Sequence, residues 1–179
     1  MTANIKRADY QRVMEKGELF FKKSGCSKSP PVDLNVAAER LGIDVRYHKL
    51  QGDVSGFLFL DKMQDPIIGI NIEHPPTRQR FTLAHEIGHF FLHAPPGGSG
   101  SFIDKGFTIV KRDTRSQLGV VVEEIEANFF AAEVLMPAEF LYPDFVSFSS
   151  RNDNLTKLAA KYDVSVEAME FRLKNLGFM

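Results

Sequence analysis

The sequence predicts an α+β fold in which a small antiparallel sheet of three strands packs against two helices. Three short runs rich in β-branched and aromatic residues follow one another between residues 43 and 72, separated by turn-forming stretches. Two longer segments with helical character come next, one ending near residue 93 and one at 122–136. The C-terminal residues also have helical spacing, so the expected chain ends in a helical region.

Two helices are expected before the sheet. Residues 5–23 have apolar side chains at helical spacing, with Val13, Met14 and Phe20 as the expected core contacts. A shorter helix is expected at 33–41, because Asp33 is a suitable N-cap and Gly42 lies just beyond the last helical position.

The three strands are expected at 43–48, 56–60 and 67–72. Turn-prone residues at 52–53 and 61–66 separate them. Such short connections favour antiparallel neighbours, and one edge of the sheet is expected to lie near the helix that follows.

The next helix carries His85 and His89, four residues apart. Side chains at this spacing share one helix face, so the two imidazoles can bind one divalent metal ion. Glu86 follows the first histidine and would lie beside the open coordination position, where it can take a proton from bound water. Apolar neighbours indicate a buried helix, with Thr77 as its expected N-cap. This pattern favours a metal-dependent hydrolase.

A catalytic zinc site usually has a third protein ligand. The extended zincin pattern would place a histidine six residues after His89, but Pro95 stands there. His93 lies two turns after His85, and their backbones would be about 12 Å apart, too far for both side chains to bind one ion comfortably. His93 is therefore expected to be structural or to contact the substrate or a metal ligand.

The helix at 122–136 is a better source of the third ligand. Glu124 and Asn128 are four residues apart on one face, so packing that face on the histidine helix would offer a carboxylate to the metal and an amide to a histidine ring. Glu123 and Glu126 are expected to point elsewhere, toward solvent.

Residues 78–89 and 124–137 closely resemble the ImmA/IrrE family of zinc metallopeptidases. Shorter matches at 31–33, 38–43, 55–57, 70–71 and 158–173 extend the resemblance over most of the chain. The resemblance implies a gluzincin-like HExxH site in which His85, His89 and Glu124 bind Zn2+ and Glu86 is the general base. The family includes proteases that cleave helix-turn-helix repressors and thereby induce mobile elements or DNA-damage responses, which implies such a repressor as substrate.

An oxyanion-stabilising group is also required by this chemistry. His93, Tyr142, Arg78 and Arg80 are candidates, although each is more simply explained by a structural role. The two arginines begin a helix and oppose its dipole, so a carboxylate partner is expected for them.

The expected domain organisation is a zincin-like metallopeptidase domain at 1–150 and a helix-turn-helix-like helical pair at 151–179, packed on the same domain. The stretch 94–118 is long for a connection between two metal-binding helices. It could be a lid, a substrate-binding element or a surface insertion.

Two other functions are compatible with the sequence. The C-terminal pair has the spacing of a DNA-binding motif, but Glu167 and Glu170 balance Arg172 and Lys174, so direct nucleic-acid binding is not expected. A non-catalytic metal-binding regulatory module is the other alternative.

The composition is that of an ordinary globular chain, with 179 residues, 44% hydrophobic residues and a formal net charge of −1. No apolar run is long enough to cross a membrane, and the first residues lack the apolar core of a signal peptide. Cys26 is the only cysteine, which excludes an internal disulfide and agrees with a reducing compartment. The expected location is the cytoplasm.

Overall fold

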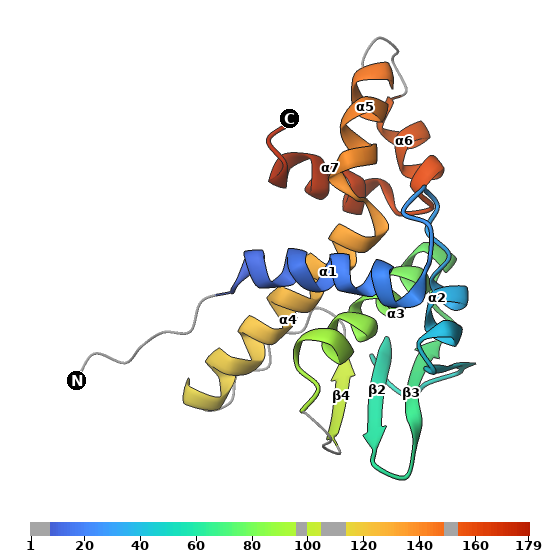
Figure 1. Ribbon diagram of the computed structural model, residues 1–179, viewed down its shortest axis with the longest axis vertical. Helices are drawn as coiled ribbons and strands as arrows, with labels where there is room; N and C mark the ends of the chain where they lie inside the picture. The colour runs from blue at the N-terminus through green and yellow to red at the C-terminus, as the bar shows by residue number, and fades with distance from the viewer. Residues whose placement is uncertain (1–7, 96–99, 105–113, 149–153) are drawn as a thin grey trace, which may run out of the picture.

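The computed structural model describes residues 8–95, 100–104, 114–148 and 154–179. These residues form an α+β fold with one sheet (Figure 1). The elements in chain order are α1 (Tyr10–Ser24), α2 (Leu34–Arg40), β1 (Asp44–His48), β2 (Gly56–Asp61), β3 (Gln64–Asn71), α3 (Pro76–Leu92), β4 (Gly100–Asp104), α4 (Thr114–Leu135), α5 (Ala138–Phe148), α6 (Asn154–Tyr162) and α7 (Val166–Asn175).

The sheet has four strands in the order β1-β3-β2-β4 and is mixed, so the expectation of three antiparallel strands is wrong in two respects. First, β1 pairs with β3 in parallel. The connection 49–55 does not return the chain alongside β1, so β2 pairs with the other side of β3 and β3 lies between β1 and β2. Second, β4 pairs with β2 in an antiparallel ladder, although it lies inside the stretch that the sequence assigns to a connection. A strand of only five residues after a Pro- and Gly-rich segment gives little signal.

The β2–β3 hairpin is tighter than the predicted turn at 61–66. Asp61 already pairs with Gln64, and the register shifts between Phe59 and Asp61. Pro66 therefore lies inside β3, opposite this irregular part of the ladder. A bulge is one of the few places where a strand tolerates a residue that cannot donate a backbone hydrogen bond.

The first two helices begin at aspartate caps. At the start of α1, the Asp9 carboxylate accepts a hydrogen bond from the backbone N–H of Arg12. At the start of α2, Asp33 accepts one from the backbone N–H of Val36, which confirms Asp33 as the predicted N-cap. Val13 and Phe20 of α1 are buried as expected, but Met14 is 45% exposed, because its face of the helix points away from the core.

Helix α3 begins directly after Pro75, which holds the cap position without a side-chain hydrogen bond. Thr77 is therefore inside the first turn and is not the cap that the sequence predicts. The pyrrolidine of Pro76 at the first helical position sets the backbone angle that a helix start requires.

The sheet and the helices meet at α3. This helix packs against β2 and β3 and also against α4, while α1 crosses both helices (Figure 1). Gly88 lets α3 and α4 approach closely, since a Cβ atom there would lie 3.1 Å from Cδ1 of Phe130 and 3.2 Å from the backbone oxygen of Ala127. The segment that carries the histidine pair is consequently covered by protein.

Helices α5 to α7 lie at the end of the molecule away from the sheet (Figure 1). The guanidinium of Arg172, 1% exposed, donates to the Glu133 carboxylate at 2.7 Å and to the backbone oxygen of Met136 at 3.2 Å, which fixes α7 to the end of α4.

Lys174 pairs with Glu170. Both basic residues of the second helix are thus held by glutamates, which argues against phosphate binding. The division at residue 150 stays a prediction.

Among the described residues, no helix is long and apolar enough to cross a membrane.

We predict that Gly56→Ala destabilises the fold. A Cβ atom at this position would lie 2.5 Å from Cγ2 of the buried Thr82 and 3.0 Å from the backbone oxygen of Gly69. Overpacking of this kind costs about 1–3 kcal/mol, which urea denaturation would measure as a lower free energy of unfolding. Gly100→Ala is the matched control in the neighbouring strand, because nothing lies within 4 Å of the added atom. Equal stability of the two variants would contradict the packing described for β2.

Candidate metal centre

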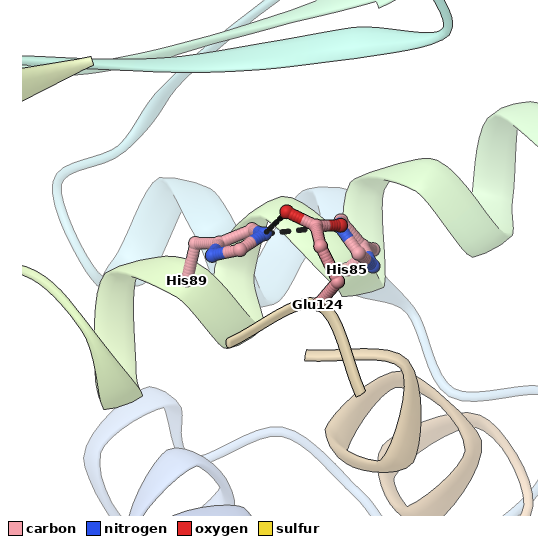
Figure 2. Close-up of side chains that lie close together, drawn as sticks. All are labelled: His85, His89 and Glu124. Atoms are coloured by element: carbon pink, nitrogen blue, oxygen red, sulfur yellow. Dashed lines mark hydrogen bonds and ion pairs between the residues drawn. The ribbon is translucent and has the colours of Figure 1, made fainter. Parts of the chain in front are cut away.

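His85 and His89 point their Nε2 atoms at the same place from one face of α3, as Figure 2 shows. The two Nε2 atoms are 3.0 Å apart, and the residues are only 3% and 2% exposed. The carboxylate of Glu124, from α4, completes the group with one oxygen 3.2 Å from His85 Nε2 and the other 3.3 Å from His89 Nε2. All three ligand atoms lie within 4.8 Å of one another, so the group could hold a metal ion.

The spacing and the chemistry of these three groups fit zinc. Donors bound to one tetrahedral zinc ion at about 2.0–2.1 Å are about 3.3 Å apart, close to the separations observed here. Two imidazoles and one carboxylate form a known ligand set of catalytic zinc sites, which leaves a fourth position for water or substrate. The Glu124 side chain is 39% exposed, so solvent reaches the group on this side.

Asn128 lies one turn after Glu124 and accepts a hydrogen bond from the His85 ring. Its Oδ1 atom is 2.9 Å from Nδ1 of His85. A metal on Nε2 leaves the proton on Nδ1, so the amide oxygen is the matching partner. The face of α4 that carries Glu124 and Asn128 thus packs on the histidine side chains of α3, as the sequence analysis expected.

Glu86 lies on the next position of α3 and is fully buried. It faces β2, because a Cβ atom on Gly56 would be 3.3 Å from its Oε1. The absence of a side chain at Gly56 therefore leaves room for this carboxylate beside the histidine pair.

His93 does not join the three ligand candidates. Its Nδ1 lies 3.0 Å from Nδ1 of His89, on the side of that ring away from Glu124, and its Nε2 lies 3.0 Å from Oε2 of Glu126. The His93 side chain is 4% exposed. His93 is thus a neighbour of a ligand candidate, one of the roles left open by the sequence.

The expectation that Glu126 faces solvent is wrong. The residue is 1% exposed, and its carboxylate also accepts a hydrogen bond from the backbone N–H of Asp9 at 2.9 Å and contacts Arg12 at 3.5 Å. Helix α1 covers this side of α4, a long-range contact that helix spacing alone does not reveal. One signal was present, since Glu126 shares a face with Phe130, which is also buried.

Burial and hydrogen bonds in this region shift three pKa values. Burial would raise the pKa of Glu124, but hydrogen bonds with His85 and His89 outweigh it, and the pKa is lowered well below its usual range. The pKa of Glu126 is also lowered, since hydrogen bonds from His93 and the Asp9 backbone outweigh burial. Burial lowers the pKa of His93, although its hydrogen bond with Glu126 partly opposes this. Both carboxylates are therefore ionised near neutral pH.

Phe102 of β4 is a site neighbour that the sequence analysis missed. Its ring stacks on the His89 imidazole, with centroids 4.9 Å apart and planes at 20°. β4 thus brings a sheet edge to the histidine pair. The choice between a lid, a substrate-binding element and a surface insertion at 94–118 stays open, because 96–99 and 105–113 lie outside the described residues.

The remaining oxyanion candidates are held by structural contacts. Arg80 donates to the backbone oxygen of Val32 and lies 3.6 Å from the carboxylate of Asp163, the kind of partner expected for it. Arg78 donates to the Ser55 hydroxyl at 2.9 Å.

Tyr142, the last of these candidates, is 59% exposed on α5 and packs against Phe178. Its contact thus belongs to the helical end of the molecule.

Residues 38–174 match the family model described as the IrrE N-terminal-like domain, Peptidase_M78. The chain belongs to this family. The resemblance seen in the sequence is therefore confirmed, and the histidine pair, Glu86 and Glu124 all lie within the matched residues.

Two curated relatives of the Peptidase_M78 chain are metallopeptidases by name. The radiation response metalloprotease IrrE of Deinococcus deserti is 33% identical over 132 residues, covering 70% of this chain and 44% of IrrE. The metallopeptidase ImmA of Bacillus subtilis is 27% identical over 129 residues, covering 70% of this chain and 66% of ImmA. The aligned region thus spans less than two thirds of either relative.

The fold of this family member also matches a solved structure, a Mycobacterium tuberculosis transcriptional regulator. The TM-score is 0.58 at 14% sequence identity, over 93% of this chain and 47% of the regulator. At this identity the likeness concerns the fold alone.

We predict that His89→Ala and Glu124→Ala each lose one divalent metal ion per chain. Metal content after loading with zinc and desalting, measured by plasma mass spectrometry, tests this. Glu123→Ala is the matched control, because it removes a carboxylate from the same helix outside the three-residue group. Circular dichroism checks that each variant is folded. Full zinc occupancy in folded Glu124→Ala would show that the third ligand is wrongly assigned.

Proposed function

We propose that this protein is a zinc-dependent metallo-endopeptidase in which His85, His89 and Glu124 hold the ion and Glu86 is the general base. The observation that carries the proposal is the convergence of three suitable ligand atoms within 4.8 Å, with a buried carboxylate on the adjoining helical position. Membership of a family whose relatives are named metallopeptidases supports the same chemistry.

Each residue of the proposed site has a separate role. A zinc ion held by His85, His89 and Glu124 would supply Lewis-acid chemistry, which would polarise the substrate carbonyl and make a water molecule easier to deprotonate. Glu86 accepts the proton of the attacking water and passes it to the leaving amine. The ligand side chains keep their places during the reaction, and Asn128 holds the His85 ring by accepting its Nδ1 proton.

The proposed substrate is a protein, namely a helix-turn-helix transcriptional repressor. The ImmA/IrrE resemblance supports this class, and the name of the radiation response metalloprotease IrrE fits a protease that acts in a stress response. Cleavage would then regulate transcription, for instance in a stress response. Such a substrate is cytoplasmic, which agrees with a chain whose only cysteine is Cys26.

Strand β4 offers a way to hold the substrate. It is the last strand in the sheet order, so within the described part of the chain only one of its sides is paired. A substrate segment can add to this edge as a further strand, with backbone hydrogen bonds that need no particular sequence. Phe102 places the edge beside His89, so the added segment would pass near the zinc ligands.

We predict that Glu86→Gln binds zinc as wild type does but loses cleavage by about 10²–10⁴-fold, because only the proton acceptor is removed. The assay mixes zinc-loaded protein with purified helix-turn-helix regulators encoded beside its gene and identifies the fragments by mass spectrometry. Glu123→Gln, which should cleave normally, is the control.

Cleavage by Glu86→Gln at the wild-type rate would exclude Glu86 as the base. A wild-type protein that binds zinc and these regulators but never cuts them would favour the non-catalytic metal-binding module.

A further inference from the structure

A chain of polar contacts runs from the proposed zinc ligand His89 to the first turn of α1. It passes from His89 to His93 at 3.0 Å and from His93 to Glu126 at 3.0 Å. Glu126 then accepts the backbone N–H of Asp9 at 2.9 Å and contacts the guanidinium of Arg12 at 3.5 Å. His93 and Glu126 have side chains only 4% and 2% exposed, so water has little access to the middle of the chain.

The ring nitrogens allow one direction of hydrogen bonding once a metal is present. The Nε2 atom of His89 faces His85 and Glu124, so a metal there leaves the proton on Nδ1. That proton points to Nδ1 of His93, which must accept it. His93 therefore carries its own proton on Nε2, where the Glu126 carboxylate accepts it.

We propose that His93 and Glu126 are positioning residues that fix the tautomer of His89 and strengthen it as a zinc ligand, and that the first turn of α1 holds Glu126 in place for this role. The inference rests on the proposed metal site. It links the carboxylate of Glu126 to His89 through the His93 ring, while Glu126 itself is not one of the three residues whose ligand atoms converge.

The two zinc histidines are supported differently. His85 donates to the amide oxygen of Asn128, whereas His89 faces the His93 ring, whose other nitrogen faces the carboxylate of Glu126. A carboxylate is a strong acceptor for the Nε2 proton of His93, which makes Nδ1 of the His93 ring a better acceptor for His89. The contact through His93 thus supports the basicity of His89.

Helix α1 holds Glu126, the last side chain in this series of polar contacts. The guanidinium of Arg12 donates to the backbone oxygen of Leu92 at 2.9 Å as well as contacting Glu126, so it joins the end of α3 to α4. Asp9 caps α1 with its side chain while its backbone N–H binds Glu126. Displacing this first turn removes two partners from the buried carboxylate, and zinc affinity should fall with it.

The first experiment needs no variant. Two-dimensional NMR of zinc-loaded protein with ¹⁵N-labelled histidine reports which nitrogen of each ring carries the proton. We expect His89 to be bound through Nε2 and His93 to be the neutral Nε2–H form. A His93 ring protonated on Nδ1 would overturn the proposal even though zinc is bound at His89.

The second experiment measures the zinc dissociation constant by competition with a chromophoric chelator. Loss of a group that supports a metal ligand typically weakens binding by about 10–100-fold, and we expect this for Glu126→Gln and a smaller loss for Arg12→Ala. Glu39→Gln is the control, because it removes the charge of an exposed glutamate on α2, outside the series of contacts from His89 to α1.

The outcomes separate the two proposals. Wild type that binds no zinc, or binds it without His89, contradicts the proposed function itself. Wild type that binds through His89 while folded Glu126→Gln has the same zinc affinity overturns only the positioning role. If Glu126→Gln does not fold, the tautomer of His93 in the wild-type protein decides.

Discussion

The close packing of α3 on α4 is the constraint on which the site depends. At Gly88 the two helices are so near that a methyl group would press on the backbone of Ala127. Three residues before Ala127, Glu124 reaches both histidines with separate carboxylate oxygens at 3.2 and 3.3 Å. A larger residue at Gly88 would separate the helices and draw the carboxylate away from the imidazoles. The glycine inside the motif is thus a packing residue for the group of His85, His89 and Glu124.

Buried charge explains why α1 lies across these two helices. An ionised carboxylate inside a protein is costly unless it has several partners. Glu126 has three, from His93, the Asp9 backbone and Arg12, and two of these belong to the start of α1. The same contacts join the end of α3 to α4, so the region around the histidines is braced on the side opposite the sheet. The contacts that stabilise the fold here therefore also hold the His93 ring against His89.

Local periodicity accounts for what the sequence could predict. His85 and His89 share a helix face by spacing alone, and so do Glu124 and Asn128, which the structure indeed brings to the histidine rings. Burial of Glu126, stacking of Phe102 on His89 and the parallel pairing of β1 with β3 all depend on segments far apart in the chain. No repeat within one helix or strand encodes such contacts, because they arise only when the elements pack.

The central claim is that these three side chains bind one zinc ion. Crystals of the zinc-loaded protein, measured on both sides of the zinc absorption edge, test it most directly. The account predicts a single strong anomalous peak about 2.0–2.2 Å from Nε2 of His85, Nε2 of His89 and an oxygen of Glu124. A zinc peak at another place on the chain, or one bound by the histidines while Glu124 points away, would contradict it.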